Sequence, residues 1–317
     1  MKVGLIGYGS IGRRHVKNLL ALGYSDITLL REKGKGNESG LAEEYDPDIF
    51  AGHDFDFIII SNPSTFHYKT ALPFLKASRN LLIEKPLVFG REEYTAMQGL
   101  LAGYRGLGMV AYNMRFHPCI LRIKEIIDGG LMGKPYSARF FVGQYLPDWR
   151  PGQDYCTGVS ALKDLGGGVV SELIHEIDMA LFLFGKPRSE ILSFAGRVSD
   201  LSIETEDISE ILYQSDSDVI ISVHQDYLNR SYRRTVEIVG ELGSMFCDLK
   251  TSAISIISGD GVILHQEEIP FERNDMYLNM MRYYTDCIKW GRKPVPDFRT
   301  ALESVRIALE VKEANNL

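Results

Sequence analysis

One glycine-rich segment constrains the fold of this chain more than any other feature of the sequence. It reads Gly7-Tyr8-Gly9-Ser10-Ile11-Gly12, directly after the apolar run Val3–Ile6, and a helical pattern begins within it. In this context the first glycine turns the chain tightly, the second lets the backbone approach a pyrophosphate, and the third lets the helix pack on the strand. The N–H groups at the start of the helix add donors for a phosphate. The segment therefore predicts a Rossmann fold with these six residues at a dinucleotide.

The first third of the chain alternates short apolar strands with helical stretches. We expect, in order, a strand at 3–6, a helix at 11–22, strands at 27–30 and 57–60, a helix at 68–77, and strands at 81–83 and 109–112. Such alternation predicts a parallel sheet covered by helices on both faces. The run Phe57–Ile60 contains no polar residue, which fits a strand buried on both sides.

The pattern changes after Asn113. A helix at 119–128 is followed by longer segments in which apolar and polar residues alternate, at 136–145, 191–198, 208–213, 219–227 and 235–239. Alternating strands in succession predict a largely antiparallel sheet. Two helices, at 276–290 and 299–315, end the chain. We therefore expect an α/β protein with a doubly wound Rossmann domain over residues 1–118 and a second α/β domain with an open, largely antiparallel sheet over residues 119–317.

The composition disfavours several classes of protein. The formal net charge of −7 gives no overall reason to bind nucleic acid or an anionic membrane. Apolar runs fall well short of the roughly 20 residues that a membrane helix needs. The four cysteines are widely spaced and form no C-x-x-C motif, which predicts reduced thiols. Because the strand-like Lys2–Ile6 follows Met1 without a signal-peptide pattern, we expect a cytoplasmic protein.

The residues after the second strand bear on which dinucleotide is bound. An acidic side chain there bonds the ribose 2′-hydroxyl of NAD, whereas an arginine accommodates the 2′-phosphate of NADP. Arg31 stands at this position, and Lys33 and Lys35 follow it. Glu32 is the counterargument, because a shift of one residue in the turn would place its carboxylate on the ribose. The sequence leaves NAD and NADP open and slightly favours NADP.

Further motifs follow the glycine segment. Ser61-Asn62-Pro63 with His67 follows the strand at 57–60, Glu84-Lys85-Pro86 follows the strand at 81–83, Asn113–Phe116 follows the strand at 109–112, and Gly166–Gly168 precedes His175-Glu176-Ile177-Asp178. This order resembles the Gfo/Idh/MocA family of oxidoreductases over nearly the whole chain. The resemblance implies a Rossmann domain with a nicotinamide cofactor and an open-faced second domain. It also implies substrates that are commonly sugars, polyols or their nucleotide-linked forms.

The resemblance also implies site residues. Catalysis in the family is usually credited to the lysine of the Glu-Lys-Pro motif and to a histidine of the second domain, which are Lys85 and His175 here. The family usually has an aspartate three residues before that histidine, whereas this chain has Glu172, whose reach is longer by one methylene. The cofactor contacts expected from the first domain, besides the glycine segment and Arg31, are Ser61, Asn62, Pro63, His67, Glu84, Lys85 and Asn113.

The residues around His175 support a chemical role without the family. On a helical wheel one arc holds Leu173, Ile174, Ile177, Ala180, Leu181 and Phe184, and the other holds Glu172, His175, Glu176, Asp178 and Met179. We therefore expect one packed face and one polar face that is free for chemistry, on which Glu172 is close enough to orient His175. Hydride transfer from a carbinol needs a base for the hydroxyl proton and positive charge beside its oxygen. His175 suits the first task and Lys85 the second.

Candidate substrate residues lie in and near the loop-like stretch 143–155. Aromatic faces and fixed polar groups suit a sugar ring, and an arginine grips a phosphate or carboxylate. The expected substrate contacts from this stretch are Tyr145, Trp149 and Tyr155, and the family resemblance adds Arg115, Glu172 and His175. An amino sugar or nucleotide sugar is one candidate. An H-E-x-x-H metal site would need a second histidine where Met179 stands, so no metal is expected.

Two other functions stay open. One is a nucleotide-binding sensor or scaffold without turnover, which the presence of both Lys85 and His175 disfavours. The other is a redox-neutral reaction, such as an epimerisation or an elimination, with a recycled NAD. Because an open sheet leaves a wide face to cover, we also expect a homodimer or homotetramer that associates through the second sheet.

Overall fold

The computed structural model describes residues 1–34 and 40–317 of the chain. They form two compact units, one of residues 1–113 with 277–305 and one of residues 114–276 with 306–317. This division is more interleaved than the predicted boundary after residue 118, because the chain returns to the first unit. Tyr284 shows why. Its buried ring lies edge-on to Phe57 at 5.3 Å between centroids, and its hydroxyl donates to the carbonyl oxygen of Leu107 at 2.8 Å.

The first unit is built on a parallel sheet with the strand order β3-β2-β1-β4-β5-β6. Its strands are β1 (Lys2–Ile6), β2 (Asp26–Leu30), β3 (Ala42–Glu44), β4 (Phe57–Ile60), β5 (Leu81–Ile83) and β6 (Gly108–Val110). This is the strand order of a dinucleotide-binding Rossmann sheet, so the predicted fold of this part is confirmed. β3 was not predicted, because it is an edge strand of three residues that has no alternating pattern.

Helices connect these strands, and they are α1 (Ser10–Ala21), α2 (Pro47–Gly52), α3 (His67–Lys76) and α4 (Arg91–Gly103). α1 links β1 to β2 and α3 links β4 to β5, so the two crossovers run in opposite directions along the sheet. Since both are expected to be right-handed, the two helices cover opposite faces. Each residue of β4 is at most 1% exposed, which confirms a strand buried on both sides.

The second unit contains a mixed sheet with the strand order β14-β13-β12-β11-β7-β10-β9-β8. The strands are β7 (Pro135–Gly143), β8 (Leu192–Gly196), β9 (Ile208–Gln214), β10 (Ile220–Asp226), β11 (Arg233–Gly240), β12 (Ser244–Asp248), β13 (Ala253–Ile257) and β14 (Ile263–Glu268). β7 and β10 are parallel, and the other described pairs are antiparallel. The predicted largely antiparallel sheet is confirmed, although β12, β13 and β14 were not expected.

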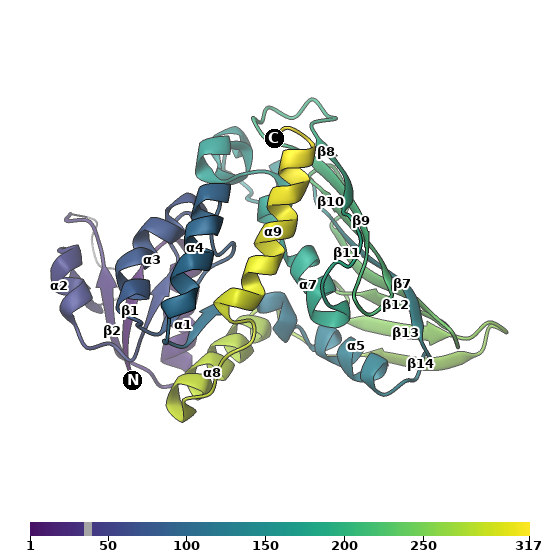
Figure 1. Cartoon of the computed structure of the whole chain (residues 1–317), viewed down its shortest axis with the longest axis horizontal. Helices are drawn as coiled ribbons and strands as arrows, with labels where there is room; N and C mark the ends of the chain where they lie inside the picture. The colour runs from purple at the N-terminus through teal and green to yellow at the C-terminus, as the bar shows by residue number, and fades with distance from the viewer. Residues whose placement is uncertain (35–39) are drawn as a thin grey trace. The chain divides into compact units, whose positions relative to one another are not determined.

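Helices cover one face of this sheet. They include α5 (Pro118–Asp128), α6 (Val169–Glu172) and α7 (His175–Phe184), and α5 and α7 lie along the same side of the strands in Figure 1. The remaining helices are α8 (Asp275–Trp290) and α9 (Phe298–Ala314). The other face of the sheet carries large apolar side chains that are 43–58% exposed, namely Leu192, Phe194, Leu212, Phe246 and Ile257.

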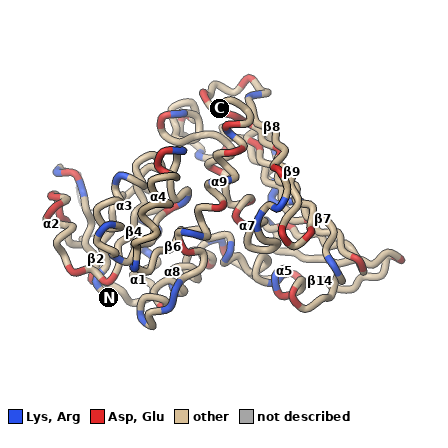
Figure 2. Tube along the Cα trace, viewed as in Figure 1, with Lys and Arg blue, Asp and Glu red and all other residues tan. Residues whose placement is uncertain are grey.

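Basic and acidic residues are intermixed along both units (Figure 2). None of the helices in the described part of the chain combines the length and apolar character that crossing a bilayer requires. All four cysteines are free thiols, and three of them are buried. Within residues 1–34 and 40–317, no three His, Cys, Asp or Glu side chains gather in a way that could hold a metal ion.

Candidate active site

The glycine loop between β1 and α1 has the geometry of a phosphate cradle. Gly7 adopts a φ of +93°, and a Cβ atom there would lie 2.3 Å from the backbone nitrogen of Asn62. A Cβ atom on Gly12 would lie 2.0 Å from the carbonyl oxygen of Gly7. At Gly9 a Cβ atom would meet no atom within 4 Å. Gly7 and Gly12 thus lie where the backbone leaves no room for a side chain, and Gly9 faces open space.

The start of α1 fits a bound phosphate. Gly9 is the N-cap residue and has no side chain to accept hydrogen bonds from the first turn. Gly9 and Ser10 are exposed, while Tyr8 and Ile11 are half-buried beside them. Backbone N–H groups at a helix start, together with the helix dipole, favour an anion. These residues therefore fit the pyrophosphate of a dinucleotide.

Two cations and a carboxylate meet at the end of β2. The guanidinium groups of Arg13 and Arg31 each lie 5.1 Å from the ring centroid of Tyr8. Nη1 of Arg31 also lies 3.9 Å from Oε1 of Glu43 in β3. Arg31 is thus beside the glycine loop as predicted, and Arg13 is a second cation that the sequence analysis missed. Lys35, a further predicted phosphate contact, lies outside the described residues.

The loop after β4 supports the glycine loop. Oγ of Ser61 donates to the carbonyl oxygen of Gly7 at 2.8 Å. Nδ2 of Asn62 donates to Oγ1 of Thr70 in α3 at 2.7 Å, and Pro63 leads into a short 3-10 turn before that helix. This loop, predicted to line the cofactor, therefore also fixes the backbone of the glycine cradle.

Glu84, Lys85 and Pro86 form a turn at the end of β5. Oε1 of Glu84 lies 2.7 Å from Nε2 of His15 in α1, and Oε2 accepts from the backbone N–H of Lys85 at 3.3 Å. His15 is fully buried, while Lys85 is half-buried. The sequence analysis missed His15. The sequence did indicate that His15 would be buried, because it lies beside Val16 on the apolar face of the expected helix. A buried imidazole needs a hydrogen-bond partner.

His67 joins this turn to the loop after β4. It is 1% exposed, its Nδ1 lies 2.7 Å from the carbonyl oxygen of Pro86, and its Nε2 lies 2.9 Å from that of Asn62. Burial lowers the pKa of His67 and outweighs the two carbonyl contacts, which raise it. Both ring nitrogens face backbone oxygens, so we correct the predicted cofactor contact of His67 to a role in holding the two loops.

The predicted cofactor residues of the first unit share the carboxyl edge of its sheet. Gly7 follows β1, Ser61 follows β4, Lys85 follows β5, and the buried Asn113 follows β6. Ligands of open α/β sheets bind outside the carboxyl ends of the strands. The fold therefore gathers at one edge residues that are scattered over more than a hundred positions of the sequence.

In the second unit, three glycines lead into α6, the short helix that precedes His175. Gly166 and Gly168 have φ values of +89° and +100°. A Cβ atom on Gly168 would lie 2.3 Å from both carboxylate oxygens of Glu206, whose Oε1 accepts from the backbone N–H of Val170 at 3.1 Å. Burial raises the pKa of Glu206. The glycines therefore make room for a buried carboxylate, which the sequence did not reveal.

The segment around His175 differs from the predicted continuous helix with a free polar face. α6 ends at Glu172 and α7 begins at His175. Glu176 and Asp178 are 0% exposed, and Glu176 accepts two hydrogen bonds from Arg234 of β11 at 2.6 and 2.9 Å. The prediction of a free polar face is therefore wrong, because distant arginines cover part of it. Glu172 and His175 stay partly exposed.

Arg115 is one of these covering arginines. Its Nε and Nη2 atoms donate to the two carboxylate oxygens of Asp178, both at 2.7 Å, and the residue is 4% exposed. Such a bidentate pair fixes both side chains strongly. Its paired, buried guanidinium orients α7, so the predicted substrate contact of Arg115 is corrected to a structural role.

The carboxylate of Glu172 belongs to a polar network of the second unit. Oγ of Ser160 donates to its Oε2 at 3.0 Å. On the neighbouring residue, Oγ of Ser171 accepts from Nζ of Lys312 in α9 at 2.7 Å. Burial lowers the pKa of Lys312, against the opposing charges of Glu206 and Glu172. Neither Ser160 nor Lys312 was expected from the sequence, and Lys312 lies 141 positions from its partner.

The predicted substrate aromatics lie in a stretch of short 3-10 turns. The guanidinium of Arg230 lies 3.6 Å from the ring centroid of Tyr145. Nε1 of Trp149 donates to a backbone carbonyl at 3.1 Å, and the hydroxyl of Tyr155 accepts from a backbone N–H at 3.2 Å. Trp149 and Tyr155 line one hollow together with Ser160. Two of the three aromatics therefore lie near the network that holds Glu172, and Tyr145 is engaged by an arginine.

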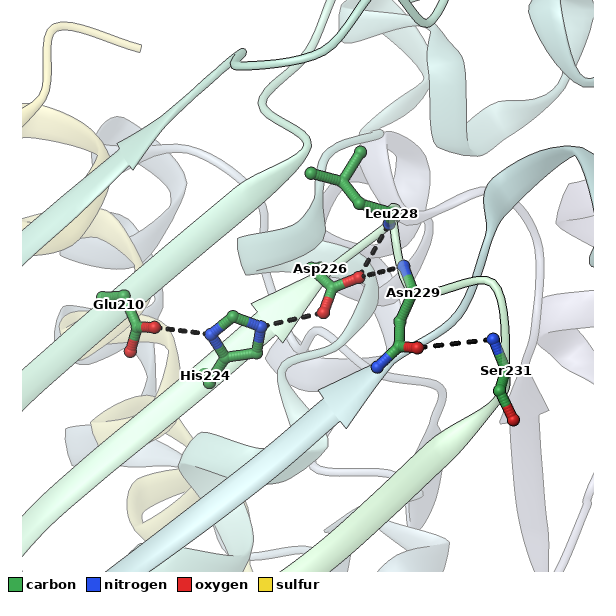
Figure 3. Close-up of polar contacts among 6 residues, drawn as sticks. All are labelled: Glu210, His224, Asp226, Leu228, Asn229 and Ser231. Atoms are coloured by element: carbon green, nitrogen blue, oxygen red, sulfur yellow. Dashed lines mark hydrogen bonds and ion pairs between the residues drawn. The ribbon is translucent and has the colours of Figure 1, made fainter.

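A separate polar cluster lies on the open face of the second sheet (Figure 3). His224 of β10 has Nδ1 2.5 Å from Oε1 of Glu210 and Nε2 2.8 Å from Oδ2 of Asp226. Burial would lower the pKa of His224, but its hydrogen bonds to Asp226 and Glu210 outweigh burial and raise it. The next residue, Gln225, donates to a backbone carbonyl on the helix-covered side. The cluster therefore faces away from α7.

Family models match both parts of the chain. The model of the oxidoreductase family with an NAD-binding Rossmann fold matches residues 1–112, and the model of the GFO/IDH/MocA C-terminal domain matches residues 120–246. The chain belongs to the GFO/IDH/MocA family. As a GFO/IDH/MocA protein it is an oxidoreductase, and its first unit is an NAD-binding Rossmann domain.

A curated relative and several solved structures that are similar to this chain are named for their activities. Inositol 2-dehydrogenase of Rhizobium meliloti is 23% identical over an alignment of 322 positions, which covers 97% of this chain and 94% of that protein. A solved levoglucosan dehydrogenase in complex with NADH has a TM-score of 0.88 at 18% identity and covers 100% of this chain and 97% of its own. UDP-N-acetylglucosamine 3-dehydrogenase from Acidithiobacillus ferrooxidans has a TM-score of 0.81 at 18% identity, covering 99% and 97%.

Proposed function

We propose that this chain transfers hydride between a nicotinamide dinucleotide and a carbon of a sugar or sugar derivative that bears a hydroxyl or carbonyl group. The observation that carries the proposal is the position of Lys85, on a turn at the same sheet edge as the glycine loop. Likeness to inositol 2-dehydrogenase and levoglucosan dehydrogenase supports a polyol or sugar substrate. Likeness to UDP-N-acetylglucosamine 3-dehydrogenase supports a nucleotide-linked sugar as the alternative.

Three side chains would carry the chemistry. In the direction of oxidation, His175 would take the proton of the substrate hydroxyl, and a bound nicotinamide would serve as the acceptor of the hydride from the same carbon. Lys85 supplies positive charge beside the oxygen as it becomes a carbonyl. Glu172 stands where the family has aspartate, and its carboxylate, held by Ser160 at 3.0 Å, binds a substrate hydroxyl and steers His175. Reduction of a carbonyl returns the same proton and hydride.

The remaining contacts with the dinucleotide and the sugar are proposed from the position of each residue in the fold. Gly9, Ser10 and the first turn of α1 would bind the pyrophosphate. The nicotinamide ribose side would be lined by Asn62, Pro63, Glu84, Lys85 and Asn113. Trp149 and Tyr155 would pack against the sugar ring, since aromatic faces suit its apolar C–H groups.

We propose NADP as the preferred cofactor. Arg31 and Arg13 flank Tyr8 at 5.1 Å each, so a 2′-phosphate at the end of β2 would meet two guanidinium groups. Glu43, 3.9 Å from Arg31, opposes this preference. Titration of the cofactor-stripped protein with NADPH and NADH, followed by nicotinamide fluorescence, decides between them. Tighter binding of NADPH supports the role of Arg31. Tighter binding of NADH would mean that an acidic residue, and not Arg31, determines the choice of cofactor.

We also propose that the protein is cytoplasmic and forms a homodimer or homotetramer through its second sheet. The free thiols are consistent with a reducing compartment. The open sheet face exposes Leu192, Phe194, Leu212, Phe246 and Ile257, and an apolar face of this kind is usually covered by a partner. Sedimentation of the wild type and of a variant with Phe194→Glu tests the assembly, because a charge on that face should shift the equilibrium toward monomer.

A stoichiometric assay tests the proposed reaction. The purified protein is supplied with NAD or NADP and a panel of inositols, anhydrosugars, free sugars and UDP-sugars, and nicotinamide absorbance and product are measured together. Hydride transfer predicts one reduced nicotinamide for each molecule of product. Product without a change in absorbance would favour a recycled cofactor. Tight nucleotide binding without any product would favour a sensor or scaffold.

A further inference from the structure

The turn that carries Lys85 is held from both sides by buried histidines of the first unit. His15 of α1 is 0% exposed, and its Nε2 lies 2.7 Å from Oε1 of Glu84. His67 at the start of α3 is 1% exposed, and its Nδ1 lies 2.7 Å from the carbonyl oxygen of Pro86. One contact fixes the residue before Lys85 and the other fixes the residue after it.

The same histidines connect this turn to the glycine loop. Nε2 of His67 lies 2.9 Å from the carbonyl oxygen of Asn62, and the neighbouring Ser61 donates to the carbonyl oxygen of Gly7 at 2.8 Å. His15 lies in the second turn of α1, the helix that begins at the glycine loop. The contacts therefore form a closed ring, which runs from the glycine loop through the loop after β4 and the Lys85 turn back to α1.

The hydrogen-bonding chemistry of histidine explains why His15 and His67 occupy their positions in this ring of contacts. A carboxylate only accepts hydrogen bonds, so the imidazole of His15 donates to Glu84 from Nε2. Such a charge-assisted bond is shorter and about twice as strong as a neutral one, and burial excludes water that would compete for it. A neutral imidazole carries one N–H, so the ring of His67 donates to one of two backbone carbonyls that belong to different loops and packs against the other. Each histidine thus links elements that are remote in sequence.

We propose that His15 and His67 are positioning residues, which fix Lys85 relative to the dinucleotide site and couple occupation of the glycine loop to the rigidity of the Lys85 turn. The catalytic consequence rests on the proposed function of Lys85, whereas the rigidity does not. A displacement of about 1 Å in a reacting group can cost roughly 10²-fold in rate, so two side chains that touch no substrate can control turnover.

Hydrogen exchange of the full chain, followed by mass spectrometry with and without NADH and NADPH, tests the ring without any substrate. In the wild type we expect nucleotide binding to slow exchange in the segment 82–89, which carries Lys85. His15→Leu and His67→Leu should raise exchange in that segment about 10-fold and abolish its protection by nucleotide, because local opening is no longer opposed. Full protection of the segment in both variants would overturn the proposal.

Conservative variants separate the hydrogen bonds from packing. The amide of His15→Gln reaches about as far as Nε2, so this variant should restore most of the protection. The amide of His67→Asn reaches only about as far as Nδ1, so it should keep the contact with Pro86 and lose the link to Asn62. The side chain of His15→Asn is too short to reach Glu84, so this variant should not restore the protection. If the leucine variants do not fold, the comparison of His15→Gln with His15→Asn tests the proposal. His117→Leu is the matched control, since this histidine is 2% exposed and belongs to the second unit. An equal effect of His117→Leu on the segment 82–89 would refute a specific ring.

Activity gives a second readout. If Lys85 is catalytic, His15→Asn should lower kcat about 10- to 10²-fold and change the KM for the sugar little, whereas His15→Gln should recover most of kcat. The two proposals fail separately. If Lys85→Ala keeps wild-type turnover, the proposed role of Lys85 is lost, while the exchange of the segment 82–89 still reports whether the histidines fix the turn.

Discussion

The glycines of the loop after β1 differ in what a side chain would meet, and this separates folding from binding. A Cβ atom on Gly9 meets no atom within 4 Å, whereas one on Gly12 would lie 2.0 Å from a backbone oxygen. We expect Gly9→Ala to lower Tm by only about 3 °C or less and to weaken nucleotide binding at least ~10-fold, because the methyl group occupies the place of the pyrophosphate. Calorimetry and fluorescence titration measure both effects. Gly12→Ala, the matched variant, should lower Tm strongly, and wild-type affinity in Gly9→Ala would contradict the cradle.

His175 gives the second prediction for a single residue. His175→Ala should lower kcat by roughly 10²–10⁴-fold, because a general base is lost, and should leave the Kd for the nucleotide within about twofold. Steady-state kinetics and fluorescence titration measure the two quantities. His265→Ala is a suitable control, since it removes a half-buried histidine of the same unit that lies 2.8 Å from Glu267 in β14. Unchanged turnover in His175→Ala would remove this residue from the mechanism.

Residues that belong to local sequence motifs could be predicted from the sequence, whereas their partners that are distant in sequence could not. The positions of Gly7, Gly9 and Lys85 could be predicted because each lies beside a strand end, where the fold class fixes its surroundings. His15 and Glu84 are 69 positions apart, and no local pattern encodes their contact. The same holds for Arg115, which was expected at the substrate and is instead paired with a carboxylate 63 positions away.

Helix α7 shows the same limit for an element. Its pattern of apolar and polar residues predicted a free face, but Glu176 and Asp178 are buried against Arg234 and Arg115. A helical wheel records which residues share a face and says nothing about what packs on that face. Charged partners from β11 and from the turn before α5 turn an apparently solvated face into a buried one.

The buried pair on α7 predicts a large effect on stability. Arg234→Leu should lower the free energy of unfolding by about 3–5 kcal/mol, because it leaves Glu176 buried without its partner. The double variant Arg234→Leu with Glu176→Leu should recover most of this loss. Urea unfolding measures both. Lys124→Met, which breaks an exposed pair with Asp128, should cost less than about 1 kcal/mol, and an equally small cost for Arg234→Leu would show that the buried pair does not hold α7.

The pair of strands β9 and β10 carries a prediction about pH. The pKa of His224 is raised in the folded state above its ordinary value of ~6.5, so this residue stabilises the fold below that pH and the contribution is lost as pH rises through the raised pKa. His224→Gln should therefore destabilise more at about pH 6 than at about pH 8.5 in urea unfolding. Glu210→Gln should weaken the same pH dependence, since it removes one of the two carboxylates at the imidazole. A cost of His224→Gln that is equal at both pH values would contradict the raised pKa.

At the scale of the whole molecule, the order of elements was predictable and their grouping was less so. The parallel and antiparallel sheets follow from strand patterns that are local in sequence. The return of α8 to the first unit depends on the packing of Tyr284 against Phe57. These two residues are 227 positions apart in the sequence. β14 was missed because its residues Ile263–Glu268 are exposed or half-buried, so no buried face marks it.

The central claim for the whole molecule is hydride transfer by an oxidoreductase of the GFO/IDH/MocA family. The most direct measurement follows deuterium from the transferable position of a labelled reduced nicotinamide, using the ketone form of whichever sugar is active in the panel, and detects the label by mass spectrometry. The account predicts one deuterium in each molecule of product, and a rate that falls by roughly 10² or more in Lys85→Ala. Product that forms without the label would contradict the account.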